Sequence, residues 1–410
     1  MADVRPFRAL RYNPARVPDL GRVIAPPYDI IGPAEQDRLH AASPHNIVRL
    51  TLAKPGESES AGDNRYTRAR AAFDAWRRDA VLRQDPEPAF YVVEQMFAAE
   101  GHVQARLGFI GLLGLEEPIE RSVLRHEATL AGPKEDRTRL LAALPANLEP
   151  IFCVYPDDGG ALQALLRGAA VGPPAFSAEW NGGVVRGWVV TDPAFLRQVS
   201  ARAAQTRLLI ADGHHRFEVA HANRHRYGAL MAFFVSMADP GLRVRPIHRV
   251  AAVGPRPGLA EALKTLGAVA MAGKAEGALA WLDDQPSAAL GRFGCLLPEG
   301  AAKLALSQET LEAWLRAPDV PAPLAGLDVT LLQRVVLPRL GIPEAAITYT
   351  ADPSDASQAV AAGRAACAFL LRRIPLDQVY ALAEQGLRLA PKSTYFTPKI
   401  PSGLALHPLV

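Results

Sequence analysis

A short polar run, ADGHHR at positions 211–216, follows an apolar stretch and is expected to open a helix. The first N–H groups of a helix have no partner within the helix and carry partial positive charge, so a helix start can bind an anion. Gly213 allows close approach of the backbone, and the planar guanidinium of Arg216 can donate two hydrogen bonds to a phosphate or carboxylate. The run therefore predicts a phosphate-binding site.

Three other side chains of this run could take part in catalysis. His214 and His215 add donors whose charge changes near neutral pH, and Asp212 could bind a metal ion or orient a hydroxyl group. Adjacent histidines lack the spacing of the HExxH zinc helix, so a structural metal site is not expected. The alternative interpretation is an Asx turn that caps a helix, with both histidines in solvent.

A second cluster combines the runs HEAT at 126–129 and KEDR at 134–137 in a loop that enters a helix. Glu127 could act as a general base, and Asp136 could bind a metal ion. Alternatively, Glu135 and Asp136 only complement the dipole of the helix in its first turn.

The third cluster is the run KSTYFTPK at 392–399, which holds two lysines, three aliphatic hydroxyls and two aromatic rings. Lys392, Ser393 and Thr394 suit the binding of phosphate or a nucleotide, although a solvated basic tail is equally compatible with the run. It lacks the glycines of a Walker loop, so P-loop chemistry is not implied. The run IHRV at 247–250 offers one more anion contact, for which a structural role is the favoured interpretation.

These residues require elements that position them. We expect a strand at 208–211, a turn at Asp212 and Gly213, a helix from His214 to about Tyr227, and a second strand from Ala229. A hairpin is expected from 90–97 and 103–112, and another hairpin is expected to turn at 298–300. Helices are expected near 258–266, 275–284, 328–339, 355–365 and 376–385. The final segment, 391–403, is rich in Pro and Lys and is expected to be an exposed loop.

Length and composition predict a multi-domain α/β protein of mixed α+β type. A chain of 410 residues is long for one core. We divide it into an N-terminal α+β region at 1–155, a segment at 156–250 that carries the ADGHHR run, and a C-terminal α/β region at 251–410. With 45 basic and 42 acidic residues, the formal charge of +3 gives no general attraction to nucleic acid or an anionic membrane.

The cysteines and the N-terminus predict a soluble cytoplasmic protein. The three cysteines form no CxxC pair, so neither a disulfide framework nor a zinc ribbon is expected. The first residues lack the apolar stretch of a secretory signal, and no apolar run approaches the roughly 20 residues of a membrane helix.

Several ordered motifs resemble a large bacterial and archaeal family of roughly this length, catalogued as a domain of unknown function. The resemblance covers nearly the whole chain, but the family name implies no activity. The motifs are PPYD at 26–29, HExT at 126–129, Asp136-Arg137, Asn147 with Pro150-Ile151-Phe152, ADGHHR at 211–216, and KSTYFxPK at 392–399.

The DGHHR turn alone is similar to the signature of the ParB/sulfiredoxin fold, which includes nucleotide-hydrolysing partition proteins, sulfiredoxins and free-serine kinases. The resemblance implies a strand–turn–helix–strand core with a phosphate site where the helix begins. His214 occupies the place of the reactive cysteine of sulfiredoxins, so their redox chemistry is not expected. Free-serine kinases resemble this turn most, since theirs also use Asp-Gly-His before an Arg.

Together these observations predict a small-molecule phosphotransferase, with free L-serine as the first choice of acceptor and Mg²⁺ as cofactor. Phosphoryl transfer depends more on positioning and charge neutralisation than on covalent chemistry. His215, Arg216 and the helix start would hold phosphate, Lys392 would neutralise developing charge, and Asp212 or Glu127 would orient the acceptor hydroxyl. The expected partners are a small substrate and a phosphate donor. The alternatives are a phosphoesterase or nucleotide hydrolase that uses the same site, and a non-catalytic nucleotide- or phosphometabolite-binding protein.

Overall fold

The chain forms two compact units in a computed structural model that describes residues 2–99, 101–128, 131–254, 256–286 and 288–409. Unit 1 consists of Met1–Arg125, Thr129–Arg243 and Pro398–Val410, and unit 2 consists of His126–Ala128 and Val244–Thr397. The last segment of the chain therefore returns to the unit in which the chain began.

These units divide the chain differently from the three segments expected from the sequence. Residue 155 is the last residue of β8 (Ile151–Tyr155), which lies between β11 (Leu208–Asp212) and β12 (Ala229–Ser236) in one sheet. A boundary at this residue would separate neighbouring strands, because the Gly/Pro-rich stretch after it is a connection within unit 1. The expected boundary at residue 250 lies close to the point where the chain enters unit 2.

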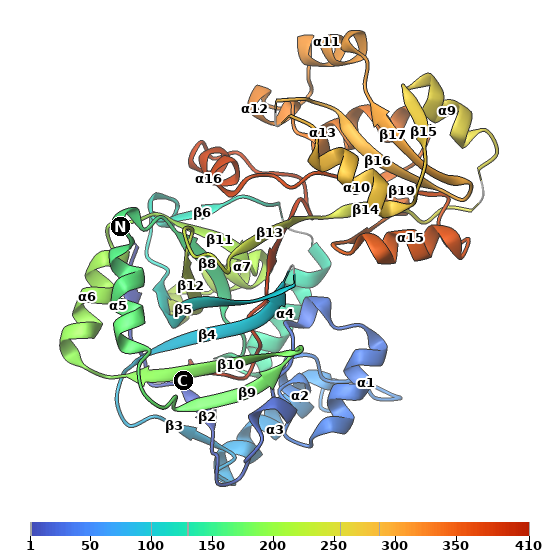
Figure 1. Cartoon of the computed structure of the whole chain (residues 1–410). Helices are drawn as coiled ribbons and strands as arrows, with labels where there is room; N and C mark the ends of the chain where they lie inside the picture. Colours follow the sequence, from blue (N-terminus) through green and yellow to red (C-terminus); the bar gives the residue numbers. More distant parts are fainter. Residues whose placement is uncertain (1, 100, 129–130, 255, 287, 410) are drawn as a thin grey trace. The chain divides into compact units, whose positions relative to one another are not determined.

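Unit 1 is built on a mixed sheet with the strand order β6-β11-β8-β12-β5-β4-β10-β9, and β1 also pairs with β5 (Figure 1). Strand β8 runs antiparallel to β11 and parallel to β12. The remaining strands of the sheet are β1 (Val4–Arg5), β4 (Phe90–Ala99), β5 (His102–Gly114), β6 (Val123–Arg125), β9 (Phe176–Trp180) and β10 (Gly183–Val190). Two short pairs accompany it: β2 (Leu10–Tyr12) with β3 (Leu82–Gln84), and β7 (Ala146–Asn147) with β21 (His407–Pro408). The hairpin of β4 and β5 confirms the expected hairpin.

Helices bury the apolar side chains of unit 1 in two clusters. Helices α5 (Ala161–Ala169) and α6 (Pro193–Ala203) lie side by side against the sheet and pack on Phe109 and Phe234, whose rings stack with centroids 4.9 Å apart (Figure 1). A second cluster contains side chains of four helices: α1 (Pro33–Ala42), α2 (Val48–Thr51), α3 (Arg65–Arg78) and α4 (Ala131–Ala143).

The expected strand–turn–helix–strand segment is present in unit 1. Strand β11 ends at Asp212, Gly213 has a φ of +89°, and α7 (His214–Ala222) begins at the next residue. A short helix, α8 (Arg224–Tyr227), completes the expected helical region and ends at Gly228, which has a φ of +67°. Strand β12 follows immediately and is buried throughout. The prediction is confirmed, except that the helix breaks at Asn223.

Unit 2 contains a second sheet with the strand order β15-β17-β16-β19-β14-β18, and β13 pairs separately with β20. Its strands are β13 (Arg243–Pro246), β14 (His248–Ala251), β15 (Ala268–Met271), β16 (Arg292–Leu297), β17 (Gly300–Ala305), β18 (Ile347–Thr350), β19 (Cys367–Leu370) and β20 (Thr394–Thr397). Its helices are α9 (Leu259–Thr265), α10 (Ala275–Asp283), α11 (Gln308–Arg316), α12 (Ala322–Ala325), α13 (Asp328–Leu331), α14 (Leu337–Arg339), α15 (Pro353–Ala361) and α16 (Leu376–Glu384). The expected helices and the hairpin turn at 298–300 are all present. The combination of helices and sheets in both units confirms the α/β class.

The segment 391–403 is not the exposed loop expected from its prolines and lysines. Thr394 and Phe396 point inward from β20 and are buried, with 8% and 0% of their surface exposed. Further along, Ile400 and Ser402 are 3% and 1% exposed. The prediction was wrong because Phe396 and Ile400 anchor the segment, and because Thr394 and Ser402 find buried partners in His126 and Glu149. No helix within the described ranges is long and apolar enough to cross a membrane.

Gly108 on β5 provides a test of the tight packing of the unit 1 sheet. A Cβ at this position would lie 2.4 Å from the backbone oxygen of Phe234 and 2.8 Å from the ring of Phe233. We expect Gly108→Ala to lower the free energy of unfolding by about 1–3 kcal/mol, because neighbouring strands must shift. Gly62→Ala is the control, since no atom lies within 4 Å of its Cβ, and it should change stability by less than about 0.5 kcal/mol. Urea unfolding followed by circular dichroism measures both; equal values would contradict the packing described for β5.

Candidate functional site

The carboxylate of Asp212 binds two cationic side chains at the end of β11. Its Oδ2 accepts a hydrogen bond from Nη2 of Arg216 at 2.9 Å, and its Oδ1 is paired with Nζ of Lys399. The three side chains are only 9–13% exposed. Because water is largely excluded, these charges interact strongly.

The two cations determine the protonation state of Asp212. Burial by itself raises the pKa of this carboxyl, but the charges of Lys399 and Arg216 outweigh burial and lower it to about 2. Asp212 is therefore ionised at neutral pH. An ionised carboxylate can orient a hydroxyl group or bind a cation, but such a low pKa makes it a weak general base.

The first turn of α7 contains the other residues expected at the site. Gly213 must be glycine, because its φ is left-handed and a Cβ would lie 2.9 Å from Cγ2 of Ile151. His214, His215 and Arg216 occupy the first three positions of the helix, as predicted. His214 is 9% exposed and lies close enough to contribute to the low pKa of Asp212, so it does not lie on a solvated face.

Arg216 is held by the protein on two sides. Besides its bond to Asp212, Nη1 donates a hydrogen bond to the backbone oxygen of Pro150 at 2.5 Å. Its Nε is buried and has no hydrogen-bond partner among the residues that the structure describes. An anion at this guanidinium could bind Nε, which has no partner among those residues, or the second N–H of Nη1 or Nη2.

Glu149, which the sequence analysis did not select, connects the site to other motifs. Its Oε1 accepts hydrogen bonds from the backbone N–H of Tyr28 at 3.0 Å and from Oγ of Ser402 at 2.9 Å. Burial raises the pKa of this carboxyl, and the charges of Arg216 and Arg137 oppose the increase only in part. The PPYD motif and the C-terminal segment therefore meet at one buried carboxyl group.

Arg137 extends this network away from α7. Its guanidinium lies 3.8 Å from the centre of the Tyr28 ring, and its Nη1 donates a hydrogen bond to the backbone oxygen of Thr51 at 2.8 Å. The same Nη1 is 3.9 Å from Oε2 of Glu149. Its Nε donates to Oδ2 of Asp136 at 2.8 Å. A buried cation thus lies between an aromatic ring and two carboxylates.

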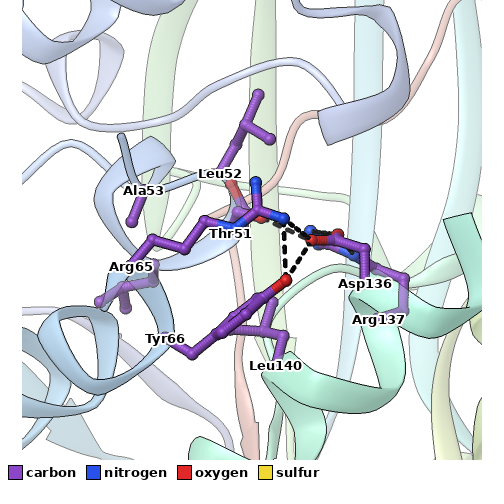
Figure 2. A pocket seen from close by; sticks show the side chains of 9 residues that line it. Thr51, Leu52, Ala53, Arg65, Tyr66, Asp136, Arg137 and Leu140 are labelled. Atoms are coloured by element: carbon purple, nitrogen blue, oxygen red, sulfur yellow. Dashed lines mark hydrogen bonds and ion pairs between the residues drawn. The ribbon is translucent and has the colours of Figure 1, made fainter. Parts of the chain in front are cut away.

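Asp136, the expected metal ligand, is surrounded by hydrogen-bond donors (Figure 2). Its Oδ1 accepts hydrogen bonds from Arg65 at 2.5 Å and from the hydroxyl of Tyr66 at 2.8 Å, and Arg137 binds Oδ2. The hollow that these residues line has a volume of only about 10 Å³, close to the least that holds one water molecule. No group of three His, Cys, Asp or Glu side chains suited to a metal ion occurs in the described part of the chain. Metal binding by Asp136 stays a prediction.

In unit 2, Glu127 and the loop at 392–394 are in direct contact, although they are far apart in sequence. Oε1 of Glu127 accepts a hydrogen bond from the backbone N–H of Lys392 at 2.9 Å. Lys392 has a φ of +59°, a conformation that few residues other than glycine adopt. The Glu127 carboxylate therefore helps to fix the backbone of this loop.

The rest of the HExT and KST motifs join the same contact. A ring nitrogen of His126 lies 2.8 Å from Oγ1 of Thr394, and Oγ of Ser393 donates a hydrogen bond to the backbone oxygen of Ala390 at 2.6 Å. Thr129, the last residue of the HExT motif, lies outside the described residues. The first part of the second sequence cluster and the first part of the third thus meet in unit 2, whereas residues 134–137, 398 and 399 belong to unit 1. The role of Lys392, Ser393 and Thr394 in phosphate binding stays a prediction.

The most important residue that the sequence analysis did not select as a site residue is Lys399. It lies in the KSTYFTPK run, but Lys392 was selected because it begins the run. Lys399 belongs to unit 1 and pairs with Asp212, whereas Lys392 belongs to unit 2. The only signal in the sequence was that a second lysine ends the same run. Glu149 gave no signal of this kind, because only the fold reveals its partners.

Acid unfolding tests the ion pairs of Asp212. The pKa of Asp212 is lowered from 3.8 to about 2 in the folded protein. The ionised carboxylate therefore contributes on the order of 2 kcal/mol to the free energy of unfolding. This contribution is present above the ordinary pKa of 3.8 and is lost as the pH falls through the folded pKa of about 2. We expect Asp212→Asn to be less stable than the native chain at neutral pH and the gap to narrow between pH 4 and pH 2. Urea unfolding at several pH values across this range measures the difference in stability between the two proteins.

Lys399→Met provides the matched control, because it removes the charge that lowers the pKa of Asp212 most. We expect this variant to lose most of the same pH dependence. A stability gap between the native chain and Asp212→Asn that stays constant down to pH 2 would contradict the low pKa.

Three solved structures are similar to this chain. A conserved hypothetical protein from Pyrococcus furiosus shares 15% identity over 72% of this chain and 94% of its own, with a TM-score of 0.37. A free serine kinase in complex with AMP shares 14% identity over 72% of this chain and 91% of its own, with a TM-score of 0.34. SbnI with a C-terminal truncation, from Staphylococcus aureus, shares 11% identity over 73% of this chain and 87% of its own, with a TM-score of 0.38.

No curated protein matches the chain. A family model, described as a protein of unknown function (DUF1015), matches residues 4–330. The match includes the PPYD, HExT and ADGHHR motifs and covers most of the chain. The chain therefore belongs to the DUF1015 family.

Proposed function

We propose that this chain is a small-molecule phosphotransferase, which transfers a phosphoryl group from a nucleotide or another phosphate donor to an alcohol. The observation that carries the proposal is the position of Asp212 between Lys399 and Arg216 at the start of α7. The resemblance of the DGHHR turn to free-serine kinases supports L-serine as the first acceptor to test.

The donor side of the proposal rests on positive charge and free backbone donors. The first N–H groups of α7 have no partner within the helix, and the helix dipole adds positive potential there. Lys399 and Arg216 both pair with Asp212, and Glu149 also lies near Arg216. A phosphate group could replace Asp212 as the partner of one cation, which would neutralise part of the negative charge of the donor. His215 would contribute a further donor.

The acceptor side rests on the ionised state of Asp212. A carboxylate that remains charged can accept a hydrogen bond from the acceptor hydroxyl and orient it, or it can bind Mg²⁺ together with donor phosphates. Mg²⁺ would supply further neutralisation of phosphate charge. His214, which is buried beside Asp212, would hold or move a proton at this point.

In unit 2, Glu127 and the loop at 392–394 form a second candidate site for phosphate. Glu127 fixes the backbone at Lys392, and Ser393 and Thr394 follow directly in the same loop. Within unit 2, Lys392 and Thr394 are proposed to bind a phosphate group, and Ser393 could donate to it only by giving up its hydrogen bond to the backbone oxygen of Ala390.

Arg216 is proposed to bind phosphate in the ground state and in the transition state. Arg216→Ala should therefore weaken donor binding, and Arg216→Lys should rescue it poorly because lysine lacks the planar fork. Calorimetric titration with ATP, ADP and pyrophosphate measures the affinity, and urea unfolding shows whether each variant is folded. Donor affinity that is unchanged in a folded Arg216→Ala variant would exclude Arg216 from the site.

Asp212 is proposed to act on turnover. We expect Asp212→Asn to bind donor but to form O-phosphoserine at least about 10²-fold more slowly, because no carboxylate then orients the acceptor hydroxyl. Asp192→Asn is the control, because Asp192 accepts a backbone hydrogen bond from Phe195 at the start of α6. This variant should keep full activity. The assay follows phosphate transfer to L-serine with each donor in turn.

The same assay separates the alternative functions. A hydrolase would consume the donor equally fast with and without L-serine, and a binding protein would bind the donor without consuming it. If the native chain phosphorylates L-serine with none of the donors, the serine-kinase proposal is wrong.

A further inference from the structure

Arg249 is a buried cation that the protein satisfies only in part. It lies on β14 and is 1% exposed. Its Nη1 donates a hydrogen bond to the backbone oxygen of Ile247 at 2.5 Å. Its Nε and Nη2 are buried and, within the part of the chain that the structure describes, have no hydrogen-bond partner. Unpaired buried donors are destabilising, and charged ones most of all.

The two unpaired groups form one edge of the guanidinium. Nε and Nη2 point in the same direction, with two N–H groups spaced to meet the two oxygens of a carboxylate or phosphate. In Arg106, the other fully buried arginine with unpaired donors, Nε and Nη1 are unpaired and do not share this edge. Its guanidinium also packs against the rings of Phe152 and Phe233, at 4.8 Å and 5.3 Å. Arg249 is therefore the stronger candidate for an oxyanion.

The position of Arg249 in the sheet brings its guanidinium next to a partly exposed tyrosine of unit 2. Successive side chains of a strand point to opposite faces, and Val250 belongs to the core that α10 and α15 cover. Arg249 therefore faces the other side. Its partner on the edge strand β18 is Tyr349, whose ring centre is 5.3 Å from the guanidinium and which is 37% exposed. The guanidinium thus lies beside a side chain that is partly exposed to solvent.

Burial and three neighbouring side chains act on the charge of Arg249 in opposite directions. Burial lowers its pKa to about 10, and Tyr349, Glu127 and Glu344 oppose this shift only in part. Glu127 is the carboxylate that fixes the backbone at Lys392. Glu127 thus binds the loop of the KST motif and also acts electrostatically on Arg249.

We propose that Arg249 binds an oxyanion, the phosphate or carboxylate group of a small molecule, through Nε and Nη2 in unit 2. This binding site is separate from the residues around Asp212 and does not require phosphoryl transfer. An oxyanion would complete the hydrogen bonds of the guanidinium and balance its charge.

The test compares the melting temperature of the full chain in potassium chloride, potassium phosphate and potassium acetate at equal ionic strength. A ligand that binds the folded state raises the melting temperature by mass action. We expect the melting temperature of the native chain to be a few degrees higher in phosphate or acetate than in chloride. In Arg249→Met this difference should disappear. Arg245→Met, which changes an exposed arginine of β13, should respond like the native chain.

Each outcome decides the proposal. A rise in phosphate alone identifies a phosphate ligand, and a rise in acetate alone identifies a carboxylate. Equal responses of the native chain and Arg249→Met would show non-specific salt effects and overturn the proposal, as would a loss of stability in Arg249→Met that is the same in all three salts. If Arg249→Met does not fold, Arg249→Lys decides: it keeps the charge but lacks the fork, so an undiminished response would overturn the proposal. Failure of the L-serine assay would leave this result unaffected.

Discussion

A buried carboxylate needs positive charge beside it, and Asp212 obtains this charge from two directions. Arg216 comes from the next turn of the same segment, and Lys399 comes from the far end of the chain. Without them, the cost of removing a carboxylate from water would favour its neutral form. The start of α7 and the path of the C-terminal segment therefore both depend on the same requirement.

Other buried charges in the interior of unit 1 also have neighbours of opposite sign. Glu149 lies near both Arg216 and Arg137, and Arg137 in turn binds Asp136. Opposite charges alternate along this row, so that each buried charge has a neighbour of the other sign. Segments that are distant in sequence contribute to the row, which ties them to one another more specifically than apolar packing would.

Much of this arrangement could be predicted from local sequence, and the rest could not. The segment around Gly213 was predictable because apolar runs, a turn and a helix start follow one another within a few residues. The partners of Asp212 and Glu149 were not, because a contact between positions such as Asp212 and Lys399 depends on how the whole chain folds. The buried course of 391–403 was missed for a related reason: prolines and lysines suggested a solvated loop, while Phe396 and Ile400 anchor it.

The path of the chain also has a consequence for biosynthesis. Unit 2 is inserted between Arg243 and Pro398, so the ribosome completes its residues before it adds the last segment of unit 1. Until Lys399 emerges, Asp212 has only Arg216 as a cationic partner, and β7 lacks β21. Unit 1 is consequently complete only after its segment from Pro398 onward has been synthesised, whereas all residues of unit 2 have been added by then. The two units are thus completed in the reverse of the order in which they begin.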